Sequence, residues 1–296
     1  MKEHVTVLLA EAVEALAIRK NSRVVDATLG SAGHAREILS RLGPRGVFIG
    51  IDADRTATDA ARAVLTSEAE VHLVAGNFRK IDSILEHLHI EKVDAVLADL
   101  GWRMEQFSGN GKGFSFQVDE PLLMTLGNPE DYAFTARDIL NDWSEESIVN
   151  VLTGYGEERY ARRIARRIAE VREKHPIETT FDLTGLIEAS VPGVYRHGRI
   201  HPATRTFQAL RIAVNDEFEA LTEFIGKAVN LLVPGGRLAI ITFHSLEDRI
   251  VKHTFRELQG REEGTVITKK PVTPSREEVT HNTRSRSAKL RVFEKQ

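Results

Sequence analysis

The sequence predicts a doubly wound α/β sheet into which an all-helical domain is inserted. Short apolar runs rich in β-branched residues alternate with helical patterns over residues 1–100, and one more such run returns near residue 240. The stretch between them is helical in pattern and poor in strand-like runs, and it is far longer than the roughly 2–6 residues of a usual connection in an α/β unit. The length of 296 residues agrees with one large domain that carries a second.

Composition narrows the class of protein. Hydrophobic residues make up 42% of the chain, enough for a sizeable core, and the formal net charge is -3. Glu11 and Glu14 interrupt the N-terminal stretch at helical spacing, which predicts an amphipathic helix rather than a secretory leader. No apolar run approaches the roughly 18 residues of a membrane span, and no cysteine is present. We expect a cytoplasmic protein without a membrane segment or a metal, and the sequence indicates no oligomeric state.

Five short apolar runs are the predicted strands of a buried parallel sheet. Each ends near a Gly, Asp or His, and they cover residues 23–29, 46–52, 71–76, 93–100 and 237–244. Helical patterns at 34–42 and 56–65 separate the first three runs, and Gly43 with Pro44 ends the first of these helices. Two later runs, at 265–269 and 289–293, are expected to form a hairpin at the sheet edge.

The inserted domain is expected at roughly residues 107–205, so that residues 1–106 and 206–296 form the sheet domain. Its predicted helices cover 136–143, 145–152, 157–174 and 180–191. Beyond the insertion, residues 206–232 are expected to form one long amphipathic helix. Pro234, Gly235 and Gly236 then turn the chain into the last strand.

Positive charge gathers on one face of the predicted helix at 157–174, whose opposite face is apolar. The basic face consists of Arg159, Arg162, Arg163, Arg166 and Arg167. A second cluster near the C-terminus consists of Arg284, Arg286, Lys289 and Arg291. Each cluster is a candidate nucleic-acid surface, with ordinary solvated charge as the alternative.

Small and acidic residues follow the first predicted strands, where an open α/β sheet binds its ligands. A turn of small residues spans Gly30 to Gly33, so a ligand can approach its backbone closely. Asp52 is placed to accept hydrogen bonds from both hydroxyls of a ribose, and Phe78 could stack on an adenine. The Gly-x-x-Gly spacing disfavours a dinucleotide, the main alternative. Asp26 suits a cationic amino-acid tail, which favours S-adenosylmethionine.

A series of motifs runs in one order along almost the whole chain. The two longest are His201-Pro-Ala-Thr-Arg-Thr-Phe-Gln-Ala-Leu-Arg211 and Phe243-His-Ser-Leu-Glu-Asp-Arg249. Others are Asp26-Ala-Thr-Leu-Gly30, Gly50-Ile-Asp52, Asp99-Leu-Gly101, Gly113-Phe-Ser-Phe116 and Arg284-Ser-Arg-Ser-Ala-Lys-Leu-Arg291. With these motifs the chain resembles the MraW/RsmH family of 16S rRNA cytosine-N4 methyltransferases nearly from end to end.

The resemblance implies a Rossmann-like class I S-adenosylmethionine methyltransferase. Its implied substrate is the exocyclic N4 of a specific cytidine in the 16S rRNA of the small ribosomal subunit, and the helical insertion is implied to help recognise that RNA. The cofactor contacts that it implies are Ala32, Gly33, His34, Asp52, Phe78, Asp99 and Gln106.

The chain departs from the family pattern after the fourth predicted strand. Where the family usually reads Asp-Leu-Gly-Val-Ser-Ser-Pro-Gln, this chain has Trp102-Arg-Met-Glu105 before Gln106. Pro121-Leu-Leu-Met-Thr-Leu-Gly127 lacks two acids and an arginine of the usual pattern, and Lys112 replaces another arginine. Two alternatives follow: a non-catalytic RNA-binding or ribosome assembly factor that keeps the cofactor pocket, and a methyltransferase with another acceptor.

Methyl transfer to a cytosine amine depends mostly on alignment and requires no metal or covalent nucleophile. Asp99 is the candidate for holding the methionine end of the cofactor and for accepting a hydrogen bond from N4. His244, after the last strand, is a second catalytic candidate. Trp102 or Phe107 could stack on a base that has left its duplex.

Other polar residues have more local interpretations. Ser245 with Asp248 is expected to form a capping box at the start of the next helix. Thr204 or Thr206 could cap a helix in the same way. The candidate phosphate contacts are Arg163, Arg167, Arg205 and Arg211.

Overall fold

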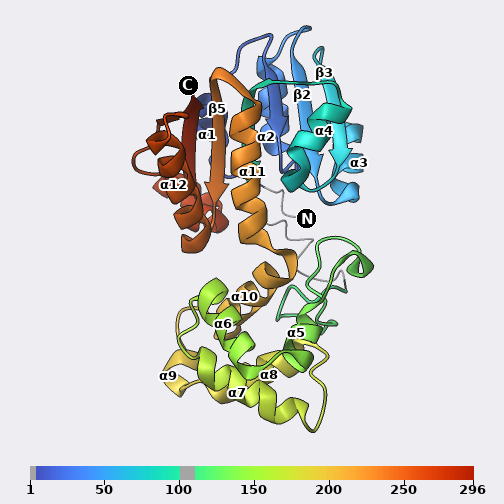
Figure 1. Ribbon diagram of the computed structural model, residues 1–296, viewed down its shortest axis with the longest axis vertical. Coiled ribbons are helices and arrows are strands. Elements are labelled where there is room, and N and C mark those ends of the chain that lie inside the picture. The colour runs from blue at the N-terminus through green and yellow to red at the C-terminus, as the bar shows by residue number, and fades with distance from the viewer. Residues whose placement is uncertain (1–4, 101–110) are drawn as a thin grey trace. The chain divides into compact units, whose positions relative to one another are not determined.

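The computed structural model describes residues 5–100 and 111–296. The chain divides into two compact units, drawn in Figure 1. The sheet unit comprises Met1–Gly101 with Phe218–Gln296, and the helical unit comprises Trp102–Glu217. Among the described residues, no helix combines the length and the apolar character needed to cross a membrane.

Seven strands in the described part of the chain form one sheet with the order β3-β2-β1-β4-β5-β7-β6. β1 to β5 are parallel, and β7 is antiparallel to β5 and β6. The chain moves from β1 outward to β3 and then from β4 outward to β5, so the predicted doubly wound sheet is confirmed. The strands are β1 (Arg23–Asp26), β2 (Val47–Asp52), β3 (Glu70–Ala75), β4 (Val93–Asp99), β5 (Leu232–Thr242), β6 (Gly264–Val266) and β7 (Lys289–Lys295).

Both faces of this sheet are buried, because side chains of the central strands alternate between two apolar clusters. Val24 and Phe48 belong to one cluster, and their neighbours Val25 and Ile49 belong to the other. The first cluster includes residues of α1 (Leu9–Ala15), α2 (Gly33–Arg41) and α3 (Arg55–Val64). The second includes residues of α4 (Ile81–His87), α11 (Glu217–Leu231) and α12 (Ser245–Gly260). This two-sided burial explains why the strands are continuous apolar runs.

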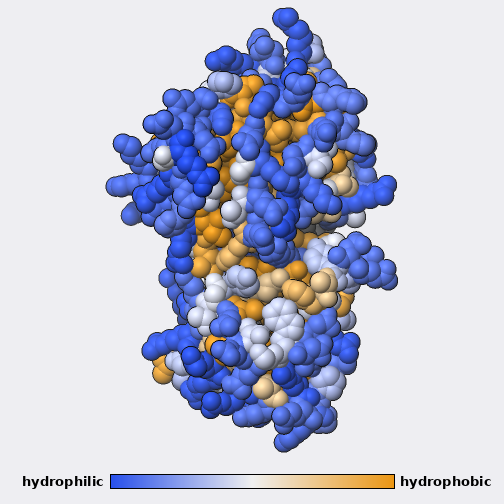
Figure 2. Space-filling model, in the orientation of Figure 1, coloured by the Kyte–Doolittle hydropathy of each residue, from blue (hydrophilic) through white to orange (hydrophobic). Residues whose placement is uncertain are grey.

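The helical unit has its own apolar core, to which Ile139, Leu152, Ile164 and Phe207 contribute. Thr135 and Thr179 form capping boxes that begin two of its helices. Hydrophilic residues cover most of the molecular face in Figure 2. The helices are η3 (Pro129–Asp131), α5 (Ala136–Asp142), α6 (Glu145–Gly156), α7 (Ala161–Arg172), α8 (Thr180–Ser190), α9 (Gly193–Arg196) and α10 (Ala203–Asn215).

The predicted long helix at 206–232 is wrong, because two helices occupy this stretch. Asp216 has a positive φ of 48° and ends α10, and α11 begins at Glu217. α10 packs on α6 closely enough that a side-chain carbon added at Gly156 would lie 2.6 Å from the Arg205 carbonyl oxygen. The helical unit therefore extends to Glu217, beyond the boundary expected at residue 205.

The expected C-terminal pairing is present, since β6 pairs antiparallel with β7. Two short elements that the sequence pattern did not indicate separate these strands: α13 (Arg276–His281) and η4 (Thr283–Ser287). β7 begins beside the end of β5, with Lys289 opposite Thr242. The η4 turn ends two residues before Lys289. It therefore lies at the edge of the sheet where the parallel strands end.

Candidate functional site

Three aspartates end three adjacent strands of the sheet unit. Asp26 ends β1, Asp52 ends β2 and Asp99 ends β4, and β1 lies between the other two. Carboxyl ends of parallel strands share one edge, and this edge includes the β1/β4 switch point where such sheets bind ligands. The residues singled out from the sequence after β1, β2 and β4 are therefore brought together.

Asp52 organises the turn that follows β1. One of its carboxylate oxygens accepts a 2.8 Å hydrogen bond from the Gly30 amide, and the other accepts a 2.9 Å hydrogen bond from the Asp54 amide. Gly30 has a positive φ of 53°, a conformation that glycine adopts at little cost. The contact of Asp52 with the ribose hydroxyls stays a prediction.

Asp26 is a buried acid with a carboxylate oxygen that lacks a partner. Its Oδ1 accepts a 3.2 Å hydrogen bond from the Thr28 amide, whereas its Oδ2 has no partner in the described part of the chain. Burial, the largest effect, raises the pKa of Asp26 to about 7; the Thr28 amide opposes the rise, and the charges of Asp99 and Asp52 add to it. An unsatisfied acid beside two others is suited to a cationic ligand group. The residues therefore fit a cofactor with an ammonium and a sulfonium.

The cofactor turn and the start of α2 are packed against the N-terminal segment. A side-chain carbon added at Gly33 would lie only 1.8 Å from Thr6 Oγ1, so a larger residue there requires Thr6 or the turn to move. Ala32 precedes α2 with a positive φ of 61°. His34 is 5% exposed; its Nε2 lies 3.1 Å from the Val7 carbonyl oxygen, and its Nδ1 lies 3.7 Å from Asp99 Oδ2. The carbonyl partner fixes Nε2 as the protonated nitrogen.

Sequence reasoning missed the residues that hold this arrangement. Thr28 Oγ1 accepts a 2.6 Å hydrogen bond from the Asp99 amide and so links β1 to β4. Glu278 of α13 accepts a hydrogen bond from the Leu8 amide across 270 positions of the chain. No local pattern signals contacts at such separations.

Phe78 begins the short helix η1 (Phe78–Lys80) after β3. Its ring is half-buried and contacts Phe224 edge-on, with 5.1 Å between ring centroids. The ring therefore belongs partly to the core, and its predicted adenine contact stays a prediction. Gln106, Trp102 and Phe107 lie outside the described residues.

His244 caps a helix, a role that the sequence pattern assigned to Ser245. Its Nδ1 accepts a 3.3 Å hydrogen bond from the Glu247 amide, and its Nε2 lies 3.0 Å from Glu247 Oε1. Glu247 in turn accepts from the His244 amide, which completes a capping box. His244 therefore caps α12 through Nδ1, whereas its buried Nε2 has no hydrogen-bond partner in the described part of the chain, and its catalytic role stays a prediction.

The expected pairing of Ser245 with Asp248 is therefore wrong, because β5 ends at Thr242 and the cap falls one residue earlier. Asp248 instead binds two basic residues of the predicted C-terminal cluster. It accepts hydrogen bonds of 2.6 Å from Arg291 Nε and 3.1 Å from Lys289 Nζ. Burial alone would raise the pKa of Asp248, but these two partners lower it below its usual value. Arg291 is buried, so it is not a surface cation.

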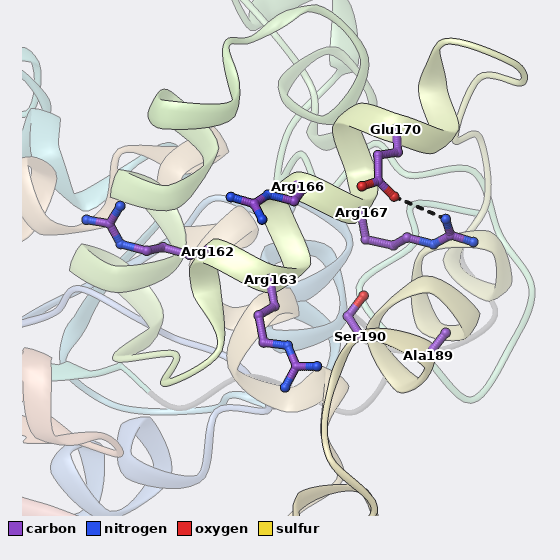
Figure 3. A pocket seen from close by; sticks show the side chains of 7 residues that line it. All are labelled: Arg162, Arg163, Arg166, Arg167, Glu170, Ala189 and Ser190. Carbon is purple, nitrogen blue, oxygen red and sulfur yellow. Dashed lines mark hydrogen bonds and ion pairs between the residues drawn. The ribbon is translucent and has the colours of Figure 1, made fainter.

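Four of the five arginines of the predicted basic face lie on α7, whereas Arg159 precedes the helix, which begins at Ala161 rather than at residue 157. Ala161, Ile164, Ala165 and Ile168 are buried, while the arginines between them are exposed. Arg167 pairs with Glu170 at 3.2 Å. Figure 3 shows the arginine side chains spreading from α7 in different directions. A shallow pocket of about 280 Å³ lies beside these arginines. It is lined by Arg162, Arg163, Arg166, Arg167, Glu170, Ala189 and Ser190.

The two arginines of the long central motif have different environments. Arg205 NH1 donates a 2.9 Å hydrogen bond to the Glu157 carbonyl oxygen, and the residue is half-buried. Arg211 is 8% exposed and binds Glu217 with two hydrogen bonds of 2.8 and 3.0 Å. A buried, doubly paired guanidinium is not presented to a phosphate, so we reassign Arg211 from RNA contact to structural ion pair.

Neither threonine of this motif caps α10, since Pro202 precedes that helix and no side chain caps it. Thr206 is fully buried, and its hydroxyl oxygen has no partner in the described part of the chain. Among the residues that the structure describes, no group of three or more His, Cys, Asp or Glu side chains is placed to hold a metal ion.

The parallel sheet with an antiparallel β7, the small-residue turn and the acids after β1, β2 and β4 define a class: α/β enzymes that bind a nucleoside cofactor at the strand ends. The chain belongs to the MraW methylase family, whose sequence model matches residues 1–296. The family resemblance predicted from the motifs is thus confirmed. A methylase agrees with S-adenosylmethionine as the predicted methyl donor, which the residues of this edge fit.

Curated relatives cover almost the whole chain. "Ribosomal RNA small subunit methyltransferase H" of Clostridium botulinum (strain Loch Maree / Type A3) is 45% identical over 99% of both chains. The proteins of the same name from Brevibacillus brevis and Halothermothrix orenii are 45% and 43% identical, over 99% and 100% of this chain and 98% and 99% of their own.

Solved structures resemble this chain more distantly. One is an rRNA methylase from Streptococcus thermophilus, with 13% identity, a TM-score of 0.44 and coverage of 99% of each chain. Another is a SAM-dependent O-methyltransferase from Thermotoga maritima, with 11% identity, a TM-score of 0.45 and coverage of 100% of this chain and 68% of its own.

Proposed function

We propose that this protein uses S-adenosylmethionine to methylate the exocyclic N4 of a specific cytidine in the 16S rRNA of the small ribosomal subunit. One observation carries the proposal: the acidic strand-end cluster of Asp26, Asp52 and Asp99 is complete in a chain that is 45% identical, over 99% of its length, to proteins named as small-subunit rRNA methyltransferases. A ribosomal RNA substrate also favours a cytoplasmic location.

The bound cofactor would supply a methyl group on a cationic sulfur. Asp52 would accept hydrogen bonds from the ribose hydroxyls while it holds the turn at Gly30. Asp26 would offer its unpartnered oxygen to the cationic end, whose positive charge offsets the cost of an ionised buried acid. The turn of small residues from Gly30 to Gly33 would let the methionine portion approach its backbone closely.

Asp99 would orient the cytosine amine. The N4 lone pair is delocalised into the ring, so this nitrogen is a weak nucleophile and its N–H bonds need an acceptor that aligns them. The Asp99 carboxylate lies at the end of β4, with its backbone held by Thr28 and its side chain beside His34. The N4 proton that leaves as the new N–C bond forms would pass to Asp99 or to solvent.

The helical unit would contribute RNA phosphate contacts. Arg163 and Arg167 project from α7 as exposed side chains, and Arg205 is half-buried, with its guanidinium group bound to the Glu157 carbonyl oxygen. Such contacts position an RNA and increase its affinity without reading its sequence. We include these three residues in the proposed interface and leave out Arg211, which is buried.

Transfer of a labelled methyl group to small subunits that lack the modification, followed by nucleoside analysis of the rRNA, tests the proposal. We expect the label in N4-methylated cytidine. Asp99→Asn should abolish most of the transfer while leaving the isolated fold intact, and Asp94→Asn, at the opposite end of the same strand, is the matched control.

Other results would select the alternatives. Label in another nucleoside would mean a different acceptor. Cofactor binding and subunit binding without any transfer would favour a non-catalytic assembly factor, and would point to the altered residues between Trp102 and Glu105 as the cause.

A further inference from the structure

The short helix η4 lies at the functional edge of the sheet unit. It directly precedes β7, whose first residue, Lys289, lies opposite the last residue of β5. Because β5 is parallel to β4, η4 is at the same edge as the acids that end β1, β2 and β4. Its place in the chain therefore carries it to the side where the substrate must approach.

Buried and capped residues fix the shape of this turn. Ser285 is fully buried and donates a hydrogen bond from its hydroxyl to the Asn282 carbonyl oxygen. Asn282 caps η4 by accepting from the Arg284 amide, and its own side-chain amide donates to the Val5 carbonyl oxygen at 3.0 Å. A turn held at both its core and its start presents its outward side chains at low entropic cost.

The outward side chains of this turn are arginines. Arg284 and Arg286 flank buried Ser285 and are both exposed. In the part of the chain that the structure describes, neither guanidinium group has a hydrogen-bond or ion-pair partner. Lys289 and Arg291, the other members of the basic cluster, are engaged by Asp248. Within this basic cluster, Arg284 and Arg286 are therefore the members ready to bind an external anion.

The same turn is linked to the cofactor site through the N-terminal segment. Asn282 holds Val5, and Glu278 of α13 accepts from the Leu8 amide at 2.9 Å. The Val7 carbonyl between them accepts from His34, whose other ring nitrogen faces Asp99. A short continuous set of contacts thus joins the basic turn to the residues proposed to hold the cofactor.

From this placement we infer that Arg284 and Arg286 form a phosphate-binding turn that holds the RNA backbone next to the methylated nucleotide. The inference rests on the proposed function, because it takes the ligand to be the substrate RNA. It adds to the arginines of α7 a second contact region, carried by the sheet unit itself. Two guanidinium groups on a fixed turn match adjacent phosphates of a single strand, and each supplies planar donors suited to phosphate oxygens.

Paired substitutions test this role. Arg284→Gln with Arg286→Gln removes two charges at the functional edge. Arg256→Gln with Arg261→Gln is the matched control, because both residues are exposed. They lie toward the end of α12, a helix that starts at the functional edge just beyond β5 and leads away from it. Binding to unmodified small subunits is measured across a range of salt concentrations. Calorimetric titration with S-adenosylmethionine verifies that each protein still binds the cofactor.

We expect the Arg284/Arg286 pair to weaken subunit binding about tenfold at moderate salt. Each lost phosphate contact lowers the slope of log affinity against log salt by about 0.7 for a single strand, so the slope should fall by about 1.4. The control pair should change neither quantity, and cofactor affinity should be the same in all three proteins. Equal weakening by both pairs, or no weakening by the Arg284/Arg286 pair, would overturn the inference.

A directed probe locates the RNA independently of affinity. The chain has no cysteine, so Ser287→Cys offers a single attachment point for a reagent that cleaves nearby RNA by hydroxyl radicals. We expect cuts within a few nucleotides of the methylated cytidine, and none there from Arg261→Cys. Cuts confined to distant rRNA would contradict the inference.

The inference and the proposed function can fail separately. If the wild-type protein transfers methyl groups to cytidine N4 while the two arginine pairs behave alike, the function stands and the phosphate-binding turn does not. If the Arg284/Arg286 pair alone weakens subunit binding but no protein transfers a methyl group, the turn stands and the proposed activity fails.

Discussion

The functional edge of the sheet unit and the basic face of α7 place charge in opposite ways. At the edge, Asp26 is buried and Asp52 is held by two backbone amides. On α7, Arg162 and Arg163 extend from an exposed surface without an ion-pair partner in the described part of the chain. A buried charge is held in one geometry, and removing its partner costs much stability. An exposed charge can change its conformation, and each of its ion pairs contributes little free energy. The first arrangement suits a small cofactor and the second suits a long polyanion.

Substitution of Arg211 should have the largest effect of those proposed here. This arginine belongs to the helical unit, but it is buried like Asp26 of the functional edge. Its pair with Glu217 is formed by side chains that are 10% and 14% exposed. Arg211→Met leaves Glu217 without this partner, and removal of one member of a buried pair costs roughly 3–5 kcal/mol. We expect a comparable loss in urea unfolding. Arg163→Met should change stability by less than about 0.5 kcal/mol, and equal losses would contradict the distinction.

Gly33 tests how closely the edge is packed. Gly33→Ala would place a carbon 1.8 Å from Thr6 Oγ1, so the turn or the N-terminal segment must move. We expect affinity for S-adenosylmethionine to fall by at least about tenfold, roughly 1.4 kcal/mol, in calorimetric titration. Thr6→Gly combined with Gly33→Ala should recover part of it. Gly154→Ala, where the added carbon meets nothing, is the control. Unchanged binding by Gly33→Ala would show that the turn is less restricted than its packing indicates.

Asp26 tests the cost of burying a charge. Its pKa is about 7 in the folded protein against 3.8 as the usual value, so the native state holds the extra proton between these pH values. Stability of the cofactor-free protein should therefore fall as pH rises through this window, by at most about 1.4 kcal/mol per pH unit, and level off above pH 7. Asp26→Asn should remove this contribution and unfold at a higher temperature than the wild type at pH 8.

The cofactor supplies the second half of that test. Asp26→Asn should bind S-adenosylmethionine more weakly at pH 8, where the wild type offers a carboxylate. A variant that gains stability without losing cofactor affinity would show that Asp26 does not contact the cationic end.

Features that depend on local patterns could be predicted from the sequence. Asp52 and Asp99 were located because strands buried on both faces are continuous apolar runs that end at a charged residue. The basic face of α7 was located because its arginines repeat at helical spacing opposite Ile164 and Ile168. In both cases, the periodicity of burial determines which side chains are exposed.

Features that depend on tertiary packing could not be predicted in this way. Arg211 lies beside Leu210 on α10, and periodicity alone does not show that Glu217, beyond a break at Asp216, turns back to bind it. The cap at His244 was misplaced by one residue because β5 ends two residues before the predicted end of the strand. The contact of Glu278 with Leu8 spans most of the chain, so only the folded sheet brings the two residues together.

The smallest expected effect comes from the exposed arginines of α7. Arg163→Gln with Arg167→Gln should leave stability and cofactor affinity unchanged and weaken binding to small subunits by about three- to tenfold, because each exposed contact contributes little and is screened by salt. The exposed pair Arg256→Gln with Arg261→Gln is again the control, since both residues lie away from the functional edge. The effect should shrink as salt is raised, since it arises from released counterions. A loss that persists at high salt would mean that these arginines are buried in the complex, and would bring the two regions closer in character than the free protein indicates.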